Sequence, residues 1–200
     1  EAGSGGAGPD GVLDAIEEAE RAHLVTPNSS GRDAQYMFGH ELIRQTLADA
    51  LSLPRRQRLH GRIALAMEML YASTLTKHVS MLAHHFYQAG AGADVEKTTD
   101  YLVQAFDQAR AAAGHEEALG YLENARSLWE GDRSERVADL LDRRAAALAS
   151  LGRNRDSLDA GKEAAALWQL LERYERYAAS MVAVCAELMW MMDIGAALAE

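Results

Sequence analysis

Histidines are the residues of this chain best suited to metal binding or acid–base chemistry, and most of them lie in its first half. A helical zinc pair needs two histidines four residues apart with an acid nearby. His78, His84 and His85 are separated by six residues and by one, so their spacing predicts no metal site. We expect His84 and His85 to divide between a helix interface and its edge, and His40 and His60 to form structural hydrogen bonds.

Arginines form one basic cluster, which consists of Arg55, Arg56, Arg58 and Arg62. Such a cluster suits contact with a phosphate, either of nucleic acid or of a nucleotide in an upstream domain. The alternative is a solvated helix start whose arginines pair with acidic neighbours, and we favour this interpretation. Binding of single-stranded nucleic acid would need interleaved aromatic residues, which the cluster lacks.

No residue pattern of the chain is typical of an enzyme. Cys185, the single cysteine, lies in an apolar run, where a buried and inert thiol is expected. The sequence contains no G-x-S-x-G nucleophile motif and no G-x-x-x-x-G-K-[ST] phosphate-binding loop. We therefore expect no catalysis, no cofactor and no ATP binding by this chain itself. A single cysteine also excludes a disulfide framework and favours a reducing, cytoplasmic location.

The composition favours a helical globular fold. Of the 200 residues, 48% are apolar and only 6% are aromatic, which favours helices over sheets when alanine, leucine, glutamate and arginine dominate. The formal net charge of −10 opposes nucleic acid binding. Residues 178–199 are mostly apolar, but Glu187 and Asp193 interrupt them. We expect a repeat helix there and no membrane span.

The first part of the chain predicts helices around one hairpin. Two short apolar runs, residues 24–26 and 36–38, flank a loop rich in Pro, Asn, Ser and Gly, which is a hairpin pattern. Ser52 and Pro54 are expected to separate the two helices that follow. Helices are predicted over residues 12–25, 41–51, 55–71 and 77–89.

Residues 99–129 are the packing unit on which the second half of the chain is organised. They predict two amphipathic helices joined at Gly114. The apolar stripes are Leu102, Ala105, Phe106 and Ala109 on one helix, and Ala118, Leu119, Leu122, Ala125 and Leu128 on the next. The spacing recurs twice, with a period of 39 or 40 residues counted from Ala118 to Ser157 to Ala197. We therefore predict stacked helix pairs, with the third truncated at Glu200.

This pattern resembles tetratricopeptide repeats, which are helix-turn-helix units of about 34 residues that stack into a superhelix. The resemblance implies an α-solenoid in which the first helix of each pair lines a groove. The predicted groove residues are Asp100, Val103, Asp107, Arg110, Asp139, Asp142, Met189 and Trp190. Such a groove would be acidic at one end and apolar at the other, and would accept a basic or amphipathic peptide. A solvated acidic face without a ligand is the alternative.

A second resemblance covers the region from the hairpin onward. Its residues are Phe38, His40, Leu42, Ile43, Arg44, Thr46, Leu47, Arg55, Arg56, Leu59, His60, Ile63 and Ala64, followed by MLAHHFYQAG at residues 81–90. This region resembles the segment that follows the nucleotide-binding domain in bacterial STAND-type signalling ATPases. These include LuxR-type transcriptional regulators and ATPases fused to class III adenylate cyclases. The resemblance makes the helix, hairpin and helix the tail of a winged-helix domain.

The second resemblance implies a non-catalytic regulatory module whose ATP and Mg²⁺ belong to an upstream domain. The candidate phosphate or interdomain contacts are then His40, Arg44, Arg55, Arg56 and Arg58. A LuxR-type regulator is the favoured parent, and the regulatory arm of an adenylate cyclase or a stand-alone peptide-binding scaffold are the alternatives. The first helix reads DAIEEAERA, which is acidic where a DNA recognition helix is basic, so no direct nucleic acid contact is expected.

The predicted fold class is all-α, with a partial winged helix and one β-hairpin followed by an α-solenoid. The predicted regions are a linker at 1–11, a winged-helix-like region with its following helix at 12–72, a connecting helix and loop at 73–98, and the repeats at 99–200. The partner is expected to be a protein or peptide. Met189, Trp190, Met191 and Met192 are expected to be exposed on the last helix and to promote self-association.

Overall fold

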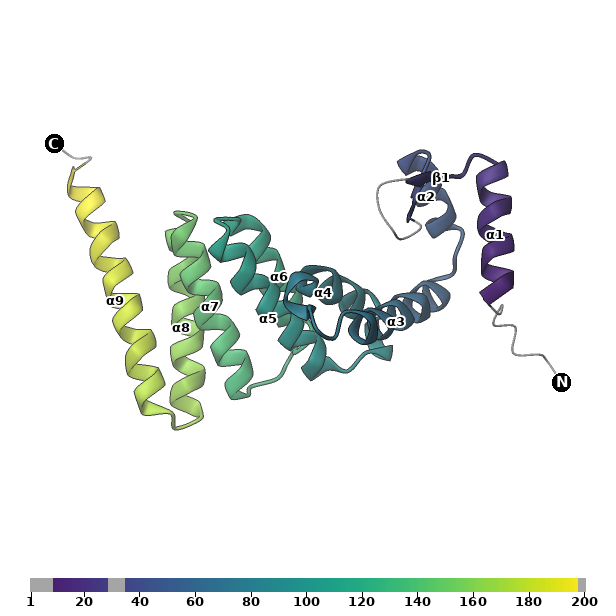
Figure 1. Cartoon of the computed structure of the whole chain (residues 1–200). Coiled ribbons are helices and arrows are strands. Elements are labelled where there is room, and N and C mark those ends of the chain that lie inside the picture. The colour runs from purple at the N-terminus through teal and green to yellow at the C-terminus, as the bar shows by residue number, and fades with distance from the viewer. Residues whose placement is uncertain (1–8, 29–34, 198–200) are drawn as a thin grey trace. The chain divides into compact units, whose positions relative to one another are not determined.

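The computed structural model describes residues 9–28 and 35–197 of the chain (Figure 1). Within these residues the regular structure is helical apart from one two-stranded antiparallel hairpin. The predicted all-α class with one β-hairpin is therefore confirmed. No helix of the described residues is long and apolar enough to cross a membrane.

The chain divides into two compact units, residues 1–56 and residues 57–200. Unit 1 contains α1 (Pro9–Arg21), β1 (Val25–Asn28), β2 (Gln35–Phe38) and α2 (Glu41–Asp49). Unit 2 contains most of α3 (Leu53–Leu70), then α4 (Val79–Gln88), α5 (Val95–Ala111), α6 (His115–Ser127), α7 (Glu135–Ser150), α8 (Asn154–Leu170) and α9 (Tyr174–Ala197). The division falls inside α3, which the sequence analysis placed in the same region as the hairpin. The region boundaries predicted at residues 72 and 98 stay predictions.

The hairpin of unit 1 confirms the sequence prediction, with Val25 opposite Phe38 and Asn28 opposite Gln35. The helix before it begins earlier than expected, at Pro9. Residues 9–11 therefore belong to α1 and not to the predicted linker, because proline is favoured in the first turn of a helix. The remainder of that linker, residues 1–8, lies outside the described residues.

Unit 1 has no buried core of its own among the residues whose side chains are described, 11–27 and 35–56. Its large apolar side chains, such as Met37, Phe38 and Leu42, are exposed. An apolar surface of this kind is typical of a segment that packs on another domain.

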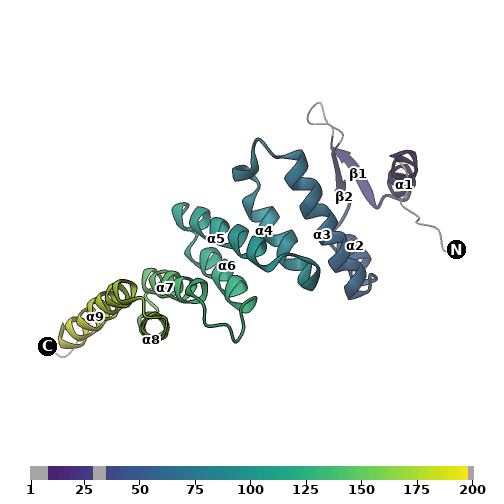
Figure 2. The same cartoon turned by 90° about the horizontal axis from the view of Figure 1, so that it is seen from below.

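Short turns connect the helices of unit 2 (Figure 2). Ala113, Gly152 and Glu172 each adopt a positive φ, between 57° and 70°, just after α5, α7 and α8. In each turn the next residue donates its N–H to a carbonyl five residues earlier, as Arg153 does to Leu148 at 2.9 Å. This left-handed helix ending satisfies the last carbonyls of the helix and reverses the chain. The predicted break between two helices is confirmed at residues 50–52, and Pro54 lies in the first turn of α3, which begins at Leu53 and accepts a proline there.

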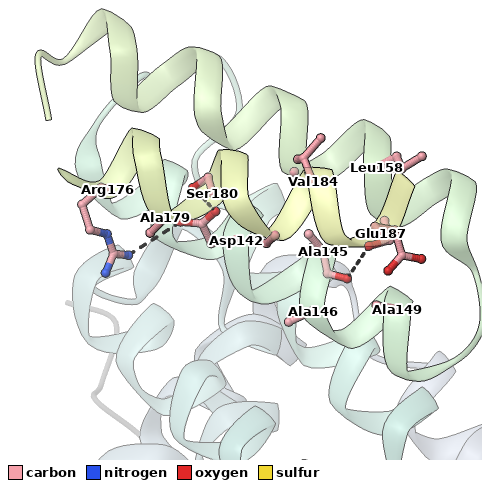
Figure 3. A pocket seen from close by; sticks show the side chains of 13 residues that line it. Asp142, Ala145, Ala146, Ala149, Leu158, Arg176, Ala179, Ser180, Val184 and Glu187 are labelled. Atoms are coloured by element: carbon pink, nitrogen blue, oxygen red, sulfur yellow. Dashed lines mark hydrogen bonds and ion pairs between the residues drawn. The ribbon is translucent and has the colours of Figure 1, made fainter. Parts of the chain in front are cut away.

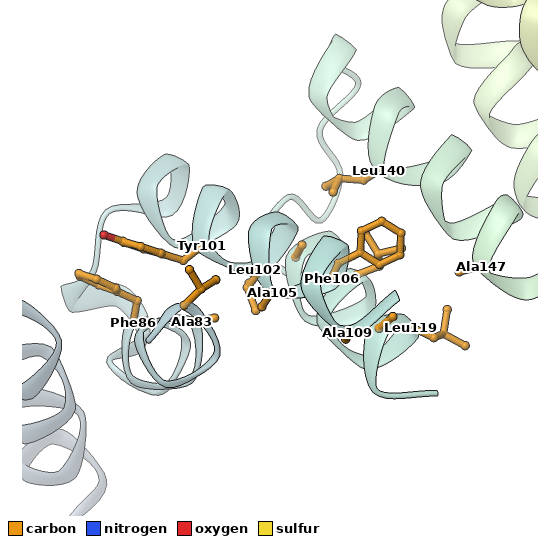
Figure 4. Packing of buried hydrophobic residues seen from close by; sticks show 14 of the residues in the cluster. Ala83, Phe86, Tyr101, Leu102, Ala105, Phe106, Ala109, Leu119, Leu140 and Ala147 are labelled. Carbon is orange, nitrogen blue, oxygen red and sulfur yellow. The ribbon is translucent and has the colours of Figure 1, made fainter. Parts of the chain in front are cut away.

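The apolar stripes predicted within residues 99–129 form the core of unit 2 (Figure 4). The buried members are Leu102, Ala105, Phe106, Ala109, Ala118, Leu119, Leu122 and Ala125, and Leu128 is partly buried. On one side, Phe86 of α4 stacks on Tyr101 of α5 with ring centroids 5.3 Å apart. On the other side, Leu140 of α7 joins the same cluster. The core therefore runs through successive helix pairs, which gives a helical repeat-like array.

One polar junction recurs between successive helix pairs. Arg136 donates from Nη1 to Asp100 Oδ1 at 2.8 Å, and its guanidinium carbon lies 5.9 Å from the ring centre of Trp129. The same contacts recur 39 or 40 residues later at Asp139, Trp168 and Arg176, with distances of 2.6 Å and 4.7 Å. Each junction joins the first helices of neighbouring pairs and covers a tryptophan, which is Trp129 just after α6 in one case and Trp168 of α8 in the other. The predicted period of 39 or 40 residues is thus repeated in contacts as well as in sequence.

Tyr101 holds its hydroxyl group in a partly buried network. The hydroxyl donates to Glu68 Oε1 at 2.6 Å, and Lys97 Nζ donates to the other oxygen of that carboxylate at 2.6 Å. Burial, and after it the hydrogen bond to Glu68, raises the pKa of Tyr101 from 10.0 to about 12. The folded state therefore keeps this phenol protonated at pH values where an unfolded chain would ionise it.

The raised pKa of Tyr101 predicts a loss of stability in alkali. Above pH 10.0 the unfolded chain releases the Tyr101 proton while the folded chain retains it up to about 12, so the free energy of unfolding falls as pH rises through this window. Tyr101→Phe is expected to make the fall shallower. Urea unfolding followed by circular dichroism below and within the window measures it, and an equally steep fall in the variant would contradict the assignment.

The last helix, α9, exposes one apolar face. Met189, Trp190 and Met192 are at least 60% exposed, as expected, and their role in self-association stays a prediction. Cys185 was expected to be buried but is exposed. The reason is that α9 contacts its neighbours along the face that carries Val184, which is 5% exposed, and Cys185 lies outside that contact.

Candidate functional site

A pocket of about 340 Å³ lies between α7, α8 and α9 (Figure 3). Most of its wall is built from small side chains. Those of α7 and α9 are Ala145, Ala146, Ala149, Ala179 and Ala183, and α8 contributes Ser157, Leu158 and Gly161. Small residues at helical spacing leave space between two helices that larger side chains would fill.

The close contact of α8 with α9 depends on Gly161. A Cβ atom added at Gly161 would lie 2.8 Å from Cγ2 of Val184 and 3.8 Å from Cβ of Ala145. The first distance is shorter than any normal carbon contact, so α9 reaches this position only because residue 161 has no side chain. Ser157 lies one turn earlier and donates from Oγ to the Ala145 carbonyl at 2.9 Å, which joins α8 to α7. Gly161 and Ser157 thus set the spacing of the pocket walls.

Asp142 organises one end of the pocket. Its Oδ2 accepts a hydrogen bond from Trp168 Nε1 at 2.8 Å, and its Oδ1 accepts one from Ser180 Oγ at 2.6 Å. Arg176 Nη2 lies 3.7 Å from Asp142 Oδ2. Trp168 is 3% exposed and Ser180 is 5% exposed, so both donors depend on this carboxylate. The three partners come from α8 and α9, and Asp142 on α7 therefore ties the three helices together.

Glu187 lies at the other end of the pocket (Figure 3). Among the described residues it has no cationic partner. With the side-chain amide of Asn154 in its satisfied orientation, the amide nitrogen donates to Glu187 Oε1 at 3.3 Å. The pocket thus has a carboxylate with an arginine nearby at the Asp142 end, an apolar middle, and at the Glu187 end a carboxylate without a cationic partner among the described residues.

The acidic residues predicted for the groove are present on α5 and α7, but arginines of the following first helix bind them. Besides the Asp100 and Asp139 contacts at the two junctions, Arg143 donates to Asp107 Oδ1 at 3.3 Å and to Asp139 Oδ2 at 2.7 Å. Nearby carboxylates raise the pKa of Arg143 despite its partial burial. The sequence prediction missed these arginines, although the spacing of 36 residues from Asp100 to Arg136 and from Asp107 to Arg143 carried the signal.

The other predicted groove residues do not meet at one site. Asp142 alone of the set lines the pocket. Val103 packs against the core, and Arg110 is exposed beside Phe106, with its guanidinium carbon 5.7 Å from the ring centre. Met189 and Trp190 are exposed on α9 and do not line the pocket.

The predicted phosphate contacts of unit 1 have local partners. His40 caps α2 by accepting a hydrogen bond from the Leu42 N–H at 3.1 Å. Arg44 is bound to Glu41, with Nε to Oε2 at 2.8 Å. This ion pair is fully exposed, and it lowers the pKa of Glu41.

The arginine cluster after α2 is only partly paired. Arg56 lies 3.7 Å from Asp49. Arg55 and Arg58 have no ion pair among the described residues. The contact role predicted for His40, Arg44 and these arginines stays a prediction.

Three histidines whose sequence spacing predicted no metal site lie close together in unit 2. His60 of α3 and His85 of α4 place their Nδ1 atoms 2.9 Å apart, and the ring of His84 lies 5.7 Å from that of His60, centroid to centroid. Burial, and after it the electrostatic influence of the neighbouring His60 and His84, lowers the pKa of His85. The sequence prediction searched for i, i+4 pairs within one helix and therefore missed a cluster shared by two helices.

Comparison of the chain with protein-family models, with curated proteins and with solved structures gives no match. The function must therefore be inferred from the geometry of the chain itself.

Proposed function

We propose that the chain is a non-catalytic interaction module, and that its pocket between α7, α8 and α9 binds a peptide segment of a protein partner. The observation that supports this is the pocket itself, with a volume of about 340 Å³ and an apolar middle. That volume falls within the range of sites that hold a ligand or a few side chains. The one hydroxyl of the pocket that lies beside a carboxylate, Ser180, is 5% exposed and shares Asp142 with Trp168, so binding accounts for these residues better than nucleophilic catalysis.

Charge defines the partner. Arg176 lies near Asp142 at one end of the pocket, whereas Glu187 at the other end has no cationic partner among the described residues. A segment that places an apolar side chain between the alanines and a lysine or arginine beside Glu187 would satisfy both features. We therefore assign the pocket to a peptide with a basic residue close to an apolar one.

Peptide selection tests this assignment. A displayed library of random peptides is selected against the chain, and the affinity of the enriched peptides is measured by calorimetry. We expect enrichment of a basic residue near an apolar one. Glu187→Lys is expected to weaken binding by about tenfold or more, which corresponds to about 1.4 kcal/mol. Asp159→Lys is the matched control, since Asp159 is an exposed acid of α8 outside the pocket. Equal affinity for both variants would contradict the assignment.

The parent protein is a second part of the proposal. The helix, hairpin and helix of unit 1 precede the helix pairs in the order found in STAND-type signalling ATPases, and unit 1 exposes apolar side chains such as Met37 and Phe38. We propose that unit 1 packs on an upstream ATPase domain of a LuxR-type regulator. Sequencing the gene across both ends of this chain tests it. A phosphate-binding loop in the same frame upstream is expected, and a start codon immediately before Glu1 would overturn the proposal.

A further inference from the structure

The histidine cluster, which consists of His60, His84 and His85, lies where α3 meets the C-terminal end of α4. Gly61 follows His60 on α3, and a Cβ atom added there would contact Ala89 Cβ at 3.5 Å. Ala64, one turn further along α3, is fully buried and belongs to the same core cluster as Leu82 of α4. The histidine side chains are therefore positioned by packed helices, which is the support a metal site requires.

The geometry of the cluster fits a transition metal ion. Each histidine offers a ring nitrogen, and the three nitrogens lie within 4.8 Å of one another. One pair of these nitrogens, Nδ1 of His60 and Nδ1 of His85, is 2.9 Å apart. A tetrahedral zinc ion with Zn–N bonds of about 2.0–2.1 Å needs nitrogens about 3.3 Å apart. That separation lies between the two observed values, so small side-chain rotations would complete a site.

The type of ligand selects the type of ion. Three imidazoles suit zinc and its first-row neighbours, whereas Mg²⁺ and Ca²⁺ prefer oxygen ligands. His60 and His85 are partly buried and His84 is exposed, so a fourth position would open toward solvent. We propose that His60, His84 and His85 form a binding site for a divalent first-row transition metal ion, Zn²⁺ above all, that ties α3 to α4.

The site is tested on the whole chain after chelator treatment and dialysis. Calorimetry with Zn²⁺ is expected to show one ion bound per chain, and Co²⁺ is expected to give the intense visible absorption of a tetrahedral site. Zn²⁺ is expected to raise the midpoint of thermal unfolding, because it binds only the folded state. Mg²⁺ is expected to do neither.

Variants separate this site from adventitious binding. His84→Ala is expected to weaken Zn²⁺ binding by at least about tenfold, and the triple variant His60→Gln, His84→Ala, His85→Gln is expected to abolish it. His115→Ala is the matched control because His115 lies on α6, outside the cluster. His84 is exposed, so its variant stays folded and decides the question even if the triple variant does not fold. Equal Zn²⁺ affinity in wild type and His84→Ala, or no Zn²⁺ binding at all, would overturn the proposal.

Discussion

Asp142→Ala is expected to lower the free energy of unfolding of unit 2 by about 2–4 kcal/mol. The substitution leaves Trp168 Nε1 and Ser180 Oγ without the acceptor that they reach at 2.8 Å and 2.6 Å. Both side chains are buried, so water cannot fully replace the lost hydrogen bonds. It also removes one of the two carboxylates near Arg176. Urea unfolding followed by tryptophan fluorescence and circular dichroism measures the change.

Two further variants define the cause of that loss. Asp142→Asn keeps one acceptor oxygen and is expected to cost less than Asp142→Ala. Asp159→Ala removes an exposed carboxylate from α8 and is expected to change stability by no more than about 0.5 kcal/mol. If Asp142→Ala were as stable as Asp159→Ala, Asp142 would not join the three helices.

Gly161→Ala is expected to destabilise the chain even though alanine is the better helix former. The added Cβ would lie 2.8 Å from Val184 Cγ2, and overpacking of this kind costs about 1–3 kcal/mol. The gain in helix propensity offsets about 1 kcal/mol of that cost. The free energy of unfolding, obtained from urea titration, is therefore expected to fall by up to about 2 kcal/mol.

Gly120→Ala is the matched control for this substitution. Gly120 also lies inside a helix, α6, but a Cβ atom added there would meet nothing within 4 Å. It is therefore expected to raise stability by up to about 1 kcal/mol. Combining Gly161→Ala with Val184→Ala is expected to recover part of the loss, because the clashing methyl group is removed. If Gly161→Ala raised the free energy of unfolding, α9 would not pack closely against α8 at Gly161.

Periodicity predicted the parts of the fold that repeat along one element. The stripe through Leu102 and Phe106 is a local pattern, and so are the two apolar runs around a turn-rich loop that predicted the hairpin. The structure confirms both. Cys185 was predicted wrongly because apolar neighbours in sequence do not say which face of a helix meets another helix. The exposure of that residue depends on how α9 packs, which is a tertiary property.

The candidate sites were harder to predict because each combines distant parts of the chain. Asp142 was predicted to line a groove, but its partners Trp168 and Ser180 lie 26 and 38 residues further along. His60 and His85 are 25 residues apart on different helices. Spacing within a single helix cannot reveal the partners of Asp142 or the histidine cluster. The recurrence of aspartate and arginine at a nearly constant separation, as in Asp100 and Arg136, was visible in the sequence.

The central claim is that the space between α7 and α9 binds a peptide, and two phenylalanine substitutions test it most directly. Ala183 and Ala186 are both exposed on α9, but only Ala183 lines the pocket. The affinity of the chain for a selected peptide is measured with Ala183→Phe and with Ala186→Phe. We predict that Ala183→Phe fills the pocket and weakens binding by at least about tenfold, while Ala186→Phe leaves the affinity unchanged. Unchanged affinity in Ala183→Phe would contradict the account, because the peptide would then bind elsewhere.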